Sequence, residues 1–258
     1  RQKRAEVEAR LAMTPRWALQ TRLTALRKRY SRQQAQNFNL NEDSGSLGVE
    51  YALARLSSAG LRLELTRGRF PQRDAATANP GVATEYDQAS ALLQAGYSPS
   101  GLSDLRAEAG YTRRDNEGQQ ARGYSGATGR FTYERRWSGK TRLAGEVFRQ
   151  LQNVEEVDAN FIERTGLALS ARLQATPLMG AVLKAERSSD RYQGAGAATV
   201  AGTPRKDEVL TLSAALEYKP FFWLKFSPNV RRESRQSNRS DRRYEDMQYA
   251  LEVEARYD

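Results

Sequence analysis

Residues 163–175 read ERTGLALSARLQA, and this stretch decides the fold. One parity is mostly apolar and carries Thr165, Leu167, Leu169, Ala171, Leu173 and Ala175. The opposite parity carries the polar side chains Arg164, Ser170, Arg172 and Gln174. A period of two is the side-chain alternation of a β-strand that has one apolar and one polar face. The stretch therefore predicts a strand with apolar surroundings on one side and water on the other.

The same alternation returns along the whole chain and predicts thirteen strands. They span residues 5–13, 17–30, 46–56, 61–68, 87–97, 102–113, 125–137, 141–151, 163–175, 178–187, 207–218, 223–232 and 245–257. Segments of about ten residues with this pattern, joined by turns, are typical of transmembrane β-barrels. We therefore expect an all-β fold, a transmembrane antiparallel up-and-down β-barrel of the bacterial outer membrane, with residues 1–258 in a single barrel domain.

The connections between these strands alternate between short and long. The short ones contain the Pro, Gly and Ser of tight turns, at residues 14–16, 57–60, 98–101, 138–140, 176–177 and 219–222. The long ones are polar and include residues 31–44, 69–86, 188–206 and 234–243. Outer-membrane barrels have short periplasmic turns and longer external loops. We therefore expect the tight turns and the C-terminus in the periplasm and the long loops outside the cell.

The number of strands predicts that the barrel is larger than this chain. A tight turn joins the first predicted strand to the second, so the first strand runs inward and Arg1 lies outside. Bacterial single-chain barrels have an even number of strands and both ends in the periplasm. The chain also begins at Arg1 rather than Met and carries no secretory signal. We therefore expect the C-terminal portion of a longer, even-stranded barrel.

The composition argues against several other classes of protein. Only 39% of the residues are hydrophobic and 28% are charged, which suits a sheet with one face in water. The sequence contains no run of 18 apolar residues, so it predicts no membrane-spanning helix. The net charge is +10, but the basic residues alternate along strands instead of forming one patch, so we expect no nucleic-acid partner. With no Cys and no His, the chain lacks disulfides, thiolate metal sites and a Ser-His-Asp triad, and we expect neither an enzyme nor a cofactor.

Aromatic residues gather near the ends of the predicted strands. Those at the turn side are Trp17, Tyr97, Trp137, Tyr218, Phe221, Phe222, Trp223 and Tyr257. Those at the loop side are Tyr30, Phe70, Tyr86, Tyr111, Tyr124, Phe161 and Tyr244. Amphipathic rings are enriched at both membrane–water interfaces, so two belts are expected, although aromatic residues also favour strands in general.

The polar parity of the strands supplies the candidate lining of a lumen. Its charged members are Arg10, Arg22, Arg62, Glu64, Arg106, Glu108, Arg130, Glu134, Arg142, Glu146, Arg172, Lys184, Glu186 and Arg256. This wall either lines an aqueous channel whose Arg excess passes anions, or its Arg and Glu neutralise each other and keep the inside soluble. For any single residue the structural role is favoured. For the wall as a whole, a preference for anionic or sugar-rich cargo is as well supported as the structural role.

Three loop features are weaker candidates for binding. The acidic groups of Glu155, Glu156 and Asp158, and of Asp241, Glu245 and Asp246, are better explained by solvated loop charge than by a cation site, so no metal is expected. The glycines of residues 194–196 are typical of a flexible linker rather than of a phosphate-binding loop. A cationic run could meet lipopolysaccharide phosphates, and it comprises Arg231, Arg232, Arg235, Arg239, Arg242 and Arg243.

Three phrases together resemble a known family. They are residues 60–71 (GLRLELTRGRFP), 95–114 (AGYSPSGLSDLRAEAGYTRR) and 124–143 (YSGATGRFTYERRWSGKTRL). They resemble the β-barrel porins of exopolysaccharide gene clusters, specifically the EpsL-type outer-membrane proteins associated with exosortase systems. The resemblance covers residues 5–218. It implies an outer-membrane barrel with further N-terminal strands and a role in secreting or assembling exopolysaccharide, and it supplies no catalytic residues.

These observations lead to one expected function and two alternatives. We expect a passive conduit or assembly component for exopolysaccharide or another anionic solute, with the outer loops as selectivity or closing elements. Its expected partners are outer-membrane lipid, lipopolysaccharide, a polysaccharide or anionic solute, and periplasmic export machinery. One alternative is a structural or adhesive barrel, plugged by its own Arg–Glu network, whose external loops bind a partner. The other is a β-sheet protein outside the membrane.

Overall fold

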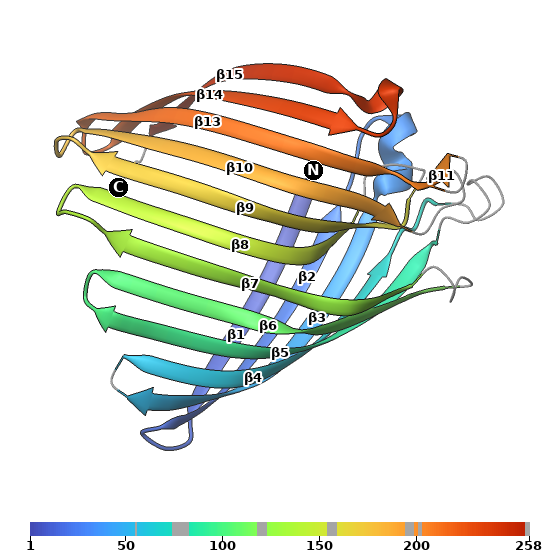
Figure 1. Ribbon diagram of the computed structural model, residues 1–258, viewed down its shortest axis with the longest axis horizontal. Coiled ribbons are helices and arrows are strands. Elements are labelled where there is room, and N and C mark those ends of the chain that lie inside the picture. The colour runs from blue at the N-terminus through green and yellow to red at the C-terminus, as the bar shows by residue number, and fades with distance from the viewer. Residues whose placement is uncertain are drawn as a thin grey trace.

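Thirteen strands form one antiparallel sheet in which every strand pairs with its neighbours in the sequence (Figure 1). The computed structural model describes residues 1–54, 56–73, 83–117, 123–153, 159–193, 199–200 and 203–255. The strands are β1 (Gln2–Ala12), β2 (Trp17–Lys28), β3 (Leu40–Ala54), β4 (Ser57–Arg69), β5 (Glu85–Ser100), β6 (Ser103–Asn116), β7 (Tyr124–Arg136), β8 (Thr141–Asn153), β9 (Phe161–Gln174), β10 (Met179–Gln193), β13 (Lys206–Phe221), β14 (Leu224–Ser237) and β15 (Tyr244–Ala255). The predicted up-and-down antiparallel fold is confirmed.

Four short elements lie in the long connections. Strands β11 (Thr199–Val200) and β12 (Thr203–Pro204) pair with each other, and η1 (Gln33–Phe38) and η4 (Ser240–Arg242) are short 3-10 helices. The sequence analysis predicted none of them, because segments this short show no hydrophobic period. Among the described residues, no helix is long and apolar enough to cross a membrane.

Most strands extend further toward the long connections than predicted, while β2 ends at Lys28 instead of residue 30. Strand β3 begins at Leu40 instead of residue 46, and β10 continues to Gln193 instead of residue 187. The apolar alternation fades in these extensions, but the backbone ladder continues because its hydrogen bonds do not depend on apolar side chains. Residues 57–60 were wrongly predicted as a turn and belong to β4. Gly60 allows β4 to lie close to β3, because a Cβ at this position would lie 2.7 Å from the Val49 carbonyl oxygen.

The two parities of each strand define an outer and an inner face. The apolar parity lies outside, where large side chains remain unburied, and Leu169 and Leu183 are 54% and 56% exposed. The polar parity lies on the concave inner face, which carries most of the contacts between non-neighbouring strands. Burying apolar area stabilises by roughly 25 cal/mol per Å², so an outer face of this kind is stable only against an apolar solvent such as lipid.

The sheet curls strongly enough to bring distant strands into contact. Asn153 at the end of β8 donates a 2.8 Å hydrogen bond to Glu42 of β3, 111 residues earlier. In Figure 1, β1, β2 and β3 pass behind the later strands. Within the described residues, β1 and β15 are the two edges of the sheet and do not pair with each other. Closure of the barrel and an even total number of strands therefore stay predictions.

Candidate functional site

The inner face carries every predicted lining residue that the structure describes. Neighbouring strands place these residues on a common face, as in the pairs Arg22–Glu8 and Glu108–Arg130. Arg256 lies outside the described residues. For convenience, the edge of the sheet formed by the tight turns is called the turn end, and the opposite edge is called the loop end.

A cavity of about 870 Å³ occupies the inner face toward the turn end. The predicted lining residues that surround it are Arg10, Arg22, Arg62, Arg106, Glu108, Arg130 and Glu146. A second cavity of about 360 Å³ lies further toward the loop end, lined among others by Glu64, Thr112 and Thr128. Arg62, Glu108 and Arg130 line both cavities and therefore separate one from the other.

The boundary between the cavities is a network of ion pairs. Arg62 of β4 reaches across β5 and pairs with Glu108 of β6. Gln94 Nε2, on the intervening β5, donates to the same carboxylate at 2.9 Å. Arg130 lies 3.5 Å from Glu146 and donates to a neighbouring glutamine at 2.7 Å. These contacts link β4, β5 and β6 to one another and, separately, β7 to β8 across the inner face.

Most other arginines of the first cavity also have carboxylate partners. Arg22 pairs with Glu8 at 3.0 Å, and Arg106 pairs with Asp104 at 2.7 Å. Arg10 pairs with Glu50 of β3 at 3.2 Å. Arg22 and Glu8 are direct cross-strand partners, and a pair of this kind contributes roughly 0.2–1 kcal/mol. The wall is therefore largely charge-neutralised, and its charges remain close enough to the cavity to contact a solute.

The remaining candidates lie on the same face but outside both cavities. Glu134 pairs with Arg142 at 3.2 Å, and Arg172 pairs with Glu217 at 3.4 Å. The last two residues of this group, Lys184 and Glu186, lie on β10. The structure therefore divides the predicted lining into a cavity group on β1–β8 and a second group, outside the cavities, on β7–β10.

A buried cluster of side chains, which the sequence pattern did not predict, closes the loop end of the inner face. We call it the loop-end cap and define it by Glu42, Tyr86, Arg114, Asn153, Asn160 and Phe161. Arg114 is 2% exposed, and its guanidinium carbon lies 3.6 Å from the Tyr86 ring centroid. The same carbon lies 5.2 Å from the ring of Phe161. A cation held between aromatic faces and out of water is a strong cation–π arrangement.

Hydrogen bonds join the loop-end cap across five strands. Arg114 Nη1 donates to Asn153 at 2.8 Å, and Asn153 Nδ2 donates to Glu42 and to the Tyr86 hydroxyl, both at 2.8 Å. The Tyr86 hydroxyl also donates to Glu42. Asn160, just before β9, accepts a 2.8 Å hydrogen bond from the backbone N–H of Ala83. The ends of β3, β5, β6, β8 and β9 are thereby tied together.

The prediction of an outward aromatic belt at the loop side is wrong for three of its residues. Phe70, Tyr86 and Phe161 are 4%, 3% and 0% exposed, so they do not form an outward belt at the loop side. They turn inward because buried guanidinium groups stack on them, and Arg73 lies 3.8 Å from the Phe70 ring. Burial, and secondarily the charge of Arg114, lowers the pKa of Arg73 to about 10.

The described turn-side aromatics and the loop-side Tyr111 remain on the outside. Trp137, Phe222 and Tyr111 are exposed, and Phe221 stacks on Trp223 with ring centroids 5.4 Å apart. Tyr244 lies on the inner face, where its hydroxyl donates to Glu233, and Tyr257 lies outside the described residues. The sequence contained one signal for the inward rings, because Arg114 lies on the same face of β6 as Glu108 and further toward the loop end. The local sequence gave no indication of which distant residues contact Arg114.

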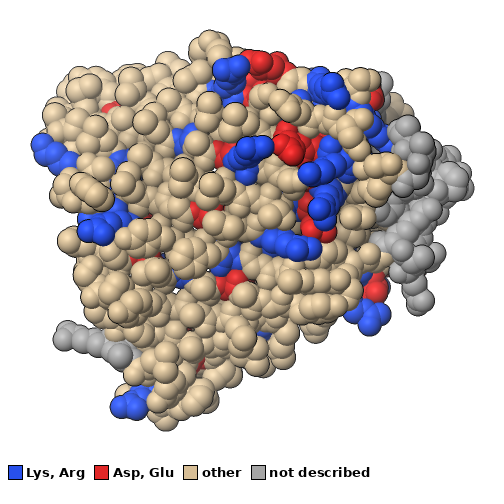
Figure 2. All heavy atoms as spheres, viewed as in Figure 1, with Lys and Arg blue, Asp and Glu red and all other residues tan. Residues whose placement is uncertain are grey.

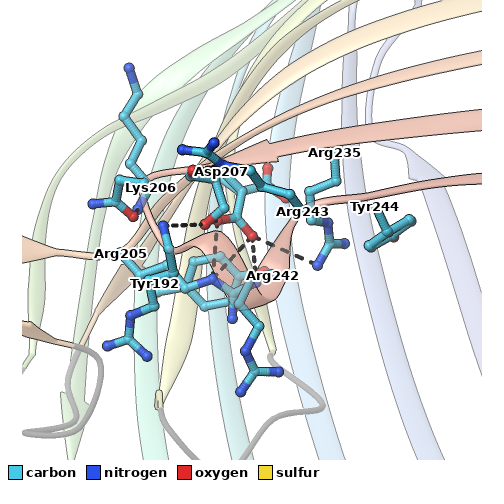
Figure 3. A network of polar contacts seen from close by, with 12 residues as sticks. Tyr192, Arg205, Lys206, Asp207, Arg235, Arg242, Arg243 and Tyr244 are labelled. Carbon is cyan, nitrogen blue, oxygen red and sulfur yellow. Dashed lines mark hydrogen bonds and ion pairs between the residues drawn. The ribbon is translucent and has the colours of Figure 1, made fainter.

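A second buried network lies at the loop end of β10, β13 and β14 (Figure 3). Arg205 and Asp207 are 1% and 0% exposed, and Arg205 Nε donates to Asp207 at 3.0 Å. Ser237 donates to the same carboxylate at 2.6 Å, and the Arg205 guanidinium stacks 3.9 Å from the Tyr192 ring. Arg235 adds an ion pair to Asp207 at 3.7 Å. The network fixes the ends of three strands.

The predicted cationic run divides between the two faces and is partly neutralised. Arg231 pairs with Glu233 at 2.6 Å on the inner face, and Arg232 pairs with Glu245 at 2.6 Å on the outer face. Asp241 lies 3.3 Å from Arg242. The acidic group at residues 155–158 and the glycines of residues 194–196 lie outside the described residues. Among the residues that the structure describes, no cluster of metal-ligating side chains is found.

Comparison with known proteins identifies the fold and no family. The sequence matches no protein-family profile and no curated protein. Among solved structures, it is similar to the ferric yersiniabactin uptake receptor FyuA from Yersinia pestis, at 9% identity and a TM-score of 0.53, over 93% of this chain and 43% of that one. The siderophore receptor PiuA from Acinetobacter baumannii gives 6% identity and a TM-score of 0.50, over 92% and 46%.

A third similar structure is a Pseudomonas aeruginosa FadL homologue, at 11% identity and a TM-score of 0.44, over 90% of this chain and 70% of that one. The chain spans less than half the length of the two siderophore receptors. At these identities the likeness concerns the fold alone. The antiparallel sheet with an apolar outer face and a polar, concave inner face is the fold of an outer-membrane β-barrel wall.

Proposed function

We propose that this chain is an integral part of the bacterial outer membrane, where its sheet forms the wall of a conduit for anionic or sugar-rich solutes. The apolar outer face supports a lipid environment, because large side chains such as Leu65 and Leu93 are exposed in rows along the strands. In this arrangement the turn end lies in the periplasm and the loop end lies outside the cell.

The observation that carries the proposal is the pair of polar cavities on the inner face. They share Arg62, Glu108 and Arg130, so a solute that moves from the turn end toward the loop end passes these three side chains. Both cavities are lined by hydrogen-bond donors and acceptors, which can replace the hydration of a polar solute.

The arginines give this path its chemical preference. Guanidinium groups bind carboxylates through two parallel hydrogen bonds and stack on flat faces, which suits acidic sugars. Opposite carboxylates such as Glu146 keep the path from trapping an anion permanently. Exopolysaccharide is the cargo that the family resemblance implies, and periplasmic export machinery is the partner that would deliver it. We propose no catalytic role.

The loop-end cap favours a second candidate function. Its hydrogen bonds close the inner face beyond the second cavity, as expected of a barrel that is plugged by its own side chains. In that case the barrel is structural or adhesive, and its long external loops bind a partner. The two candidates share the fold and differ in whether the cap opens.

Conductance separates the two candidates. The full-length protein is incorporated into planar bilayers, and single-channel current and ion selectivity are recorded with and without an acidic oligosaccharide. A neutral oligosaccharide of equal length is the control. We expect anion-selective current that the acidic oligosaccharide blocks more strongly than the neutral one. A barrel that inserts and stays silent supports the plugged candidate instead.

A further inference from the structure

The outer face of β9, β10, β13 and β14 carries an apolar groove of about 670 Å³. Its floor contains Ala171, Ala185 and Ala214, and leucines stand beside them. The register alternates small and large residues between strands: Leu183 pairs with both Ala171 and Ala214, while Ala185 pairs with two leucines. The small residues therefore leave a channel between leucine ridges, wide enough for hydrocarbon.

A basic pocket of about 940 Å³ lies at the loop end of the same strands. It is lined by Arg191, Lys206 and Arg243, and by a single carboxylate from Glu208. Glu208 is shared between Lys206 at 3.6 Å and Arg187 at 3.0 Å. In the described part of the chain, neither Arg191 nor Arg243 has a carboxylate partner, so the pocket keeps an excess of positive charge.

The pocket is built on a rigid floor. Arg205, which also lines it, is held by Asp207 and Tyr192 in the buried network of Figure 3. Arg243 Nε donates a 2.8 Å hydrogen bond to the backbone carbonyl of Ser237, which orients its guanidinium. Preorganised cations of this kind bind an anion without a large ordering cost.

The spacing of groove and pocket matches one leaflet of a membrane. Eight residues of β13 separate Ala214 from Lys206, or about 27 Å along the strand. With a strand tilt of about 40°, this corresponds to about 21 Å along the membrane normal. Half of a bilayer with its headgroups is also about 21 Å thick. Figure 2 shows this face, with most of the charged atoms toward the loop end and fewer of them over the middle and the turn end.

We propose that the groove and the pocket form one binding site for a phosphorylated glycolipid of the outer leaflet. An acyl chain lies in the groove over Ala185 and Ala214, and the phosphates contact Arg191, Lys206 and Arg243. The excess positive charge suits a headgroup with more than one phosphate, which favours a glycolipid over a phospholipid with a single phosphate. This proposal depends on the membrane orientation given in the proposed function, but it does not require that a solute passes through the barrel.

Lipid retention during purification tests the headgroup contacts. The full-length protein is refolded with lipid A, washed in detergent, and analysed by native mass spectrometry. Arg191→Gln with Arg243→Gln should lower the retained lipid at least about tenfold, or by about 1.4 kcal/mol, because the double variant loses the charge-assisted hydrogen bonds to the phosphates. Arg67→Gln with Arg113→Gln is the matched control, since both are outward arginines on strands away from the site, and it should retain lipid normally. Equal retention by all three proteins would overturn the proposal.

Two further comparisons test the groove and the class of lipid. Ala185→Trp should fill the groove and reduce retention, whereas Ala109→Trp, on the outer face of β6, should not. Dephosphorylated lipid A and phosphatidylglycerol should both be retained less than lipid A, and equal retention of either would overturn the assignment. Heat-modifiable gel migration and conductance are recorded on the same samples. A correctly folded barrel that conducts no current but still retains lipid A would contradict the proposed conduit and leave the proposed lipid site intact.

Discussion

Arg114 has an environment unlike that of the other inner-face arginines. Most of those are half-exposed and paired with carboxylates, whereas Arg114 is buried between two aromatic rings and bonded to amide oxygens. A buried cation without a direct carboxylate partner depends on every neighbour that solvates it. The smallest change that disturbs this arrangement is in Asn153, which links the cation to Glu42 and Tyr86.

We expect Asn153→Ala to loosen the loop-end cap. The substitution removes the acceptor of Arg114 and a donor to Glu42, and a buried group left without its partner costs about 1–3 kcal/mol. In planar bilayers the variant should conduct for a larger fraction of time than the wild type. Asn229→Ala, on β14 away from the cap, is the control. Unchanged current would mean that the cap does not obstruct the path.

In the proposed conduit, ion selectivity depends on two arginines that line the cavity at the turn end of the inner face. Arg106→Glu with Arg130→Glu reverses two charges in the lining, so an anion preference should weaken or reverse. Arg67→Glu, whose side chain lies on the outer face of β4, should leave selectivity unchanged. Reversal potentials measured in a salt gradient check both variants. Wild-type selectivity in the double variant would rule out a solute path along this wall.

At the scale of the element, alternation in β9 assigns each side chain to lipid or to water. Leu169→Arg places a charge on the outer face and should impair insertion by roughly 2–4 kcal/mol if the residue lies near the midplane. Ser170→Arg, one residue later and on the inner face, should insert normally. Folding into vesicles followed by heat-modifiable migration measures both. The opposite ranking would reverse the assignment of the two faces.

The predictability of each element follows from the range of the interactions that form it. Strands β9 and β13 could be predicted from the sequence because their outer residues alternate with polar ones over ten or more positions. The loop-end parts of β3 and β10 were not, because polar side chains there hide a backbone ladder that is still intact. Residues 57–60 contain the Ser and Gly typical of a turn, but tertiary pairing with β3 and β5 holds them in a strand.

The candidate site was predictable as a face and not as a set of partners. Parity alone placed Arg62, Glu108 and Arg130 on the inner side of their strands. It could not tell that Arg62 reaches past β5 to Glu108, because that contact depends on the curvature of the sheet. The loop-end cap was missed for the same reason, since Asn153 and Glu42 are 111 residues apart.

For the whole molecule, the alternation of turns and loops predicts a membrane topology that labelling can test. The chain has no cysteine, so single cysteines can be introduced without background. In intact cells, Gly139→Cys at the turn end should be protected from a membrane-impermeant maleimide, and Arg239→Cys at the loop end should react. Both should react after the outer membrane is permeabilised. Labelling of Gly139→Cys in intact cells would invert the topology.

The length of β13 has a consequence for where the protein meets its surroundings. Its 16 residues extend about 54 Å, or about 42 Å along the membrane normal at a tilt of about 40°. The apolar band of such barrels is only about 25 Å tall. In the proposed orientation, with Ala214 near the midplane, the loop end of β13 at Lys206 therefore lies beyond the apolar band and at the level of the headgroups. A polymer leaving the barrel there would emerge past the hydrocarbon of the membrane, among the charged headgroups.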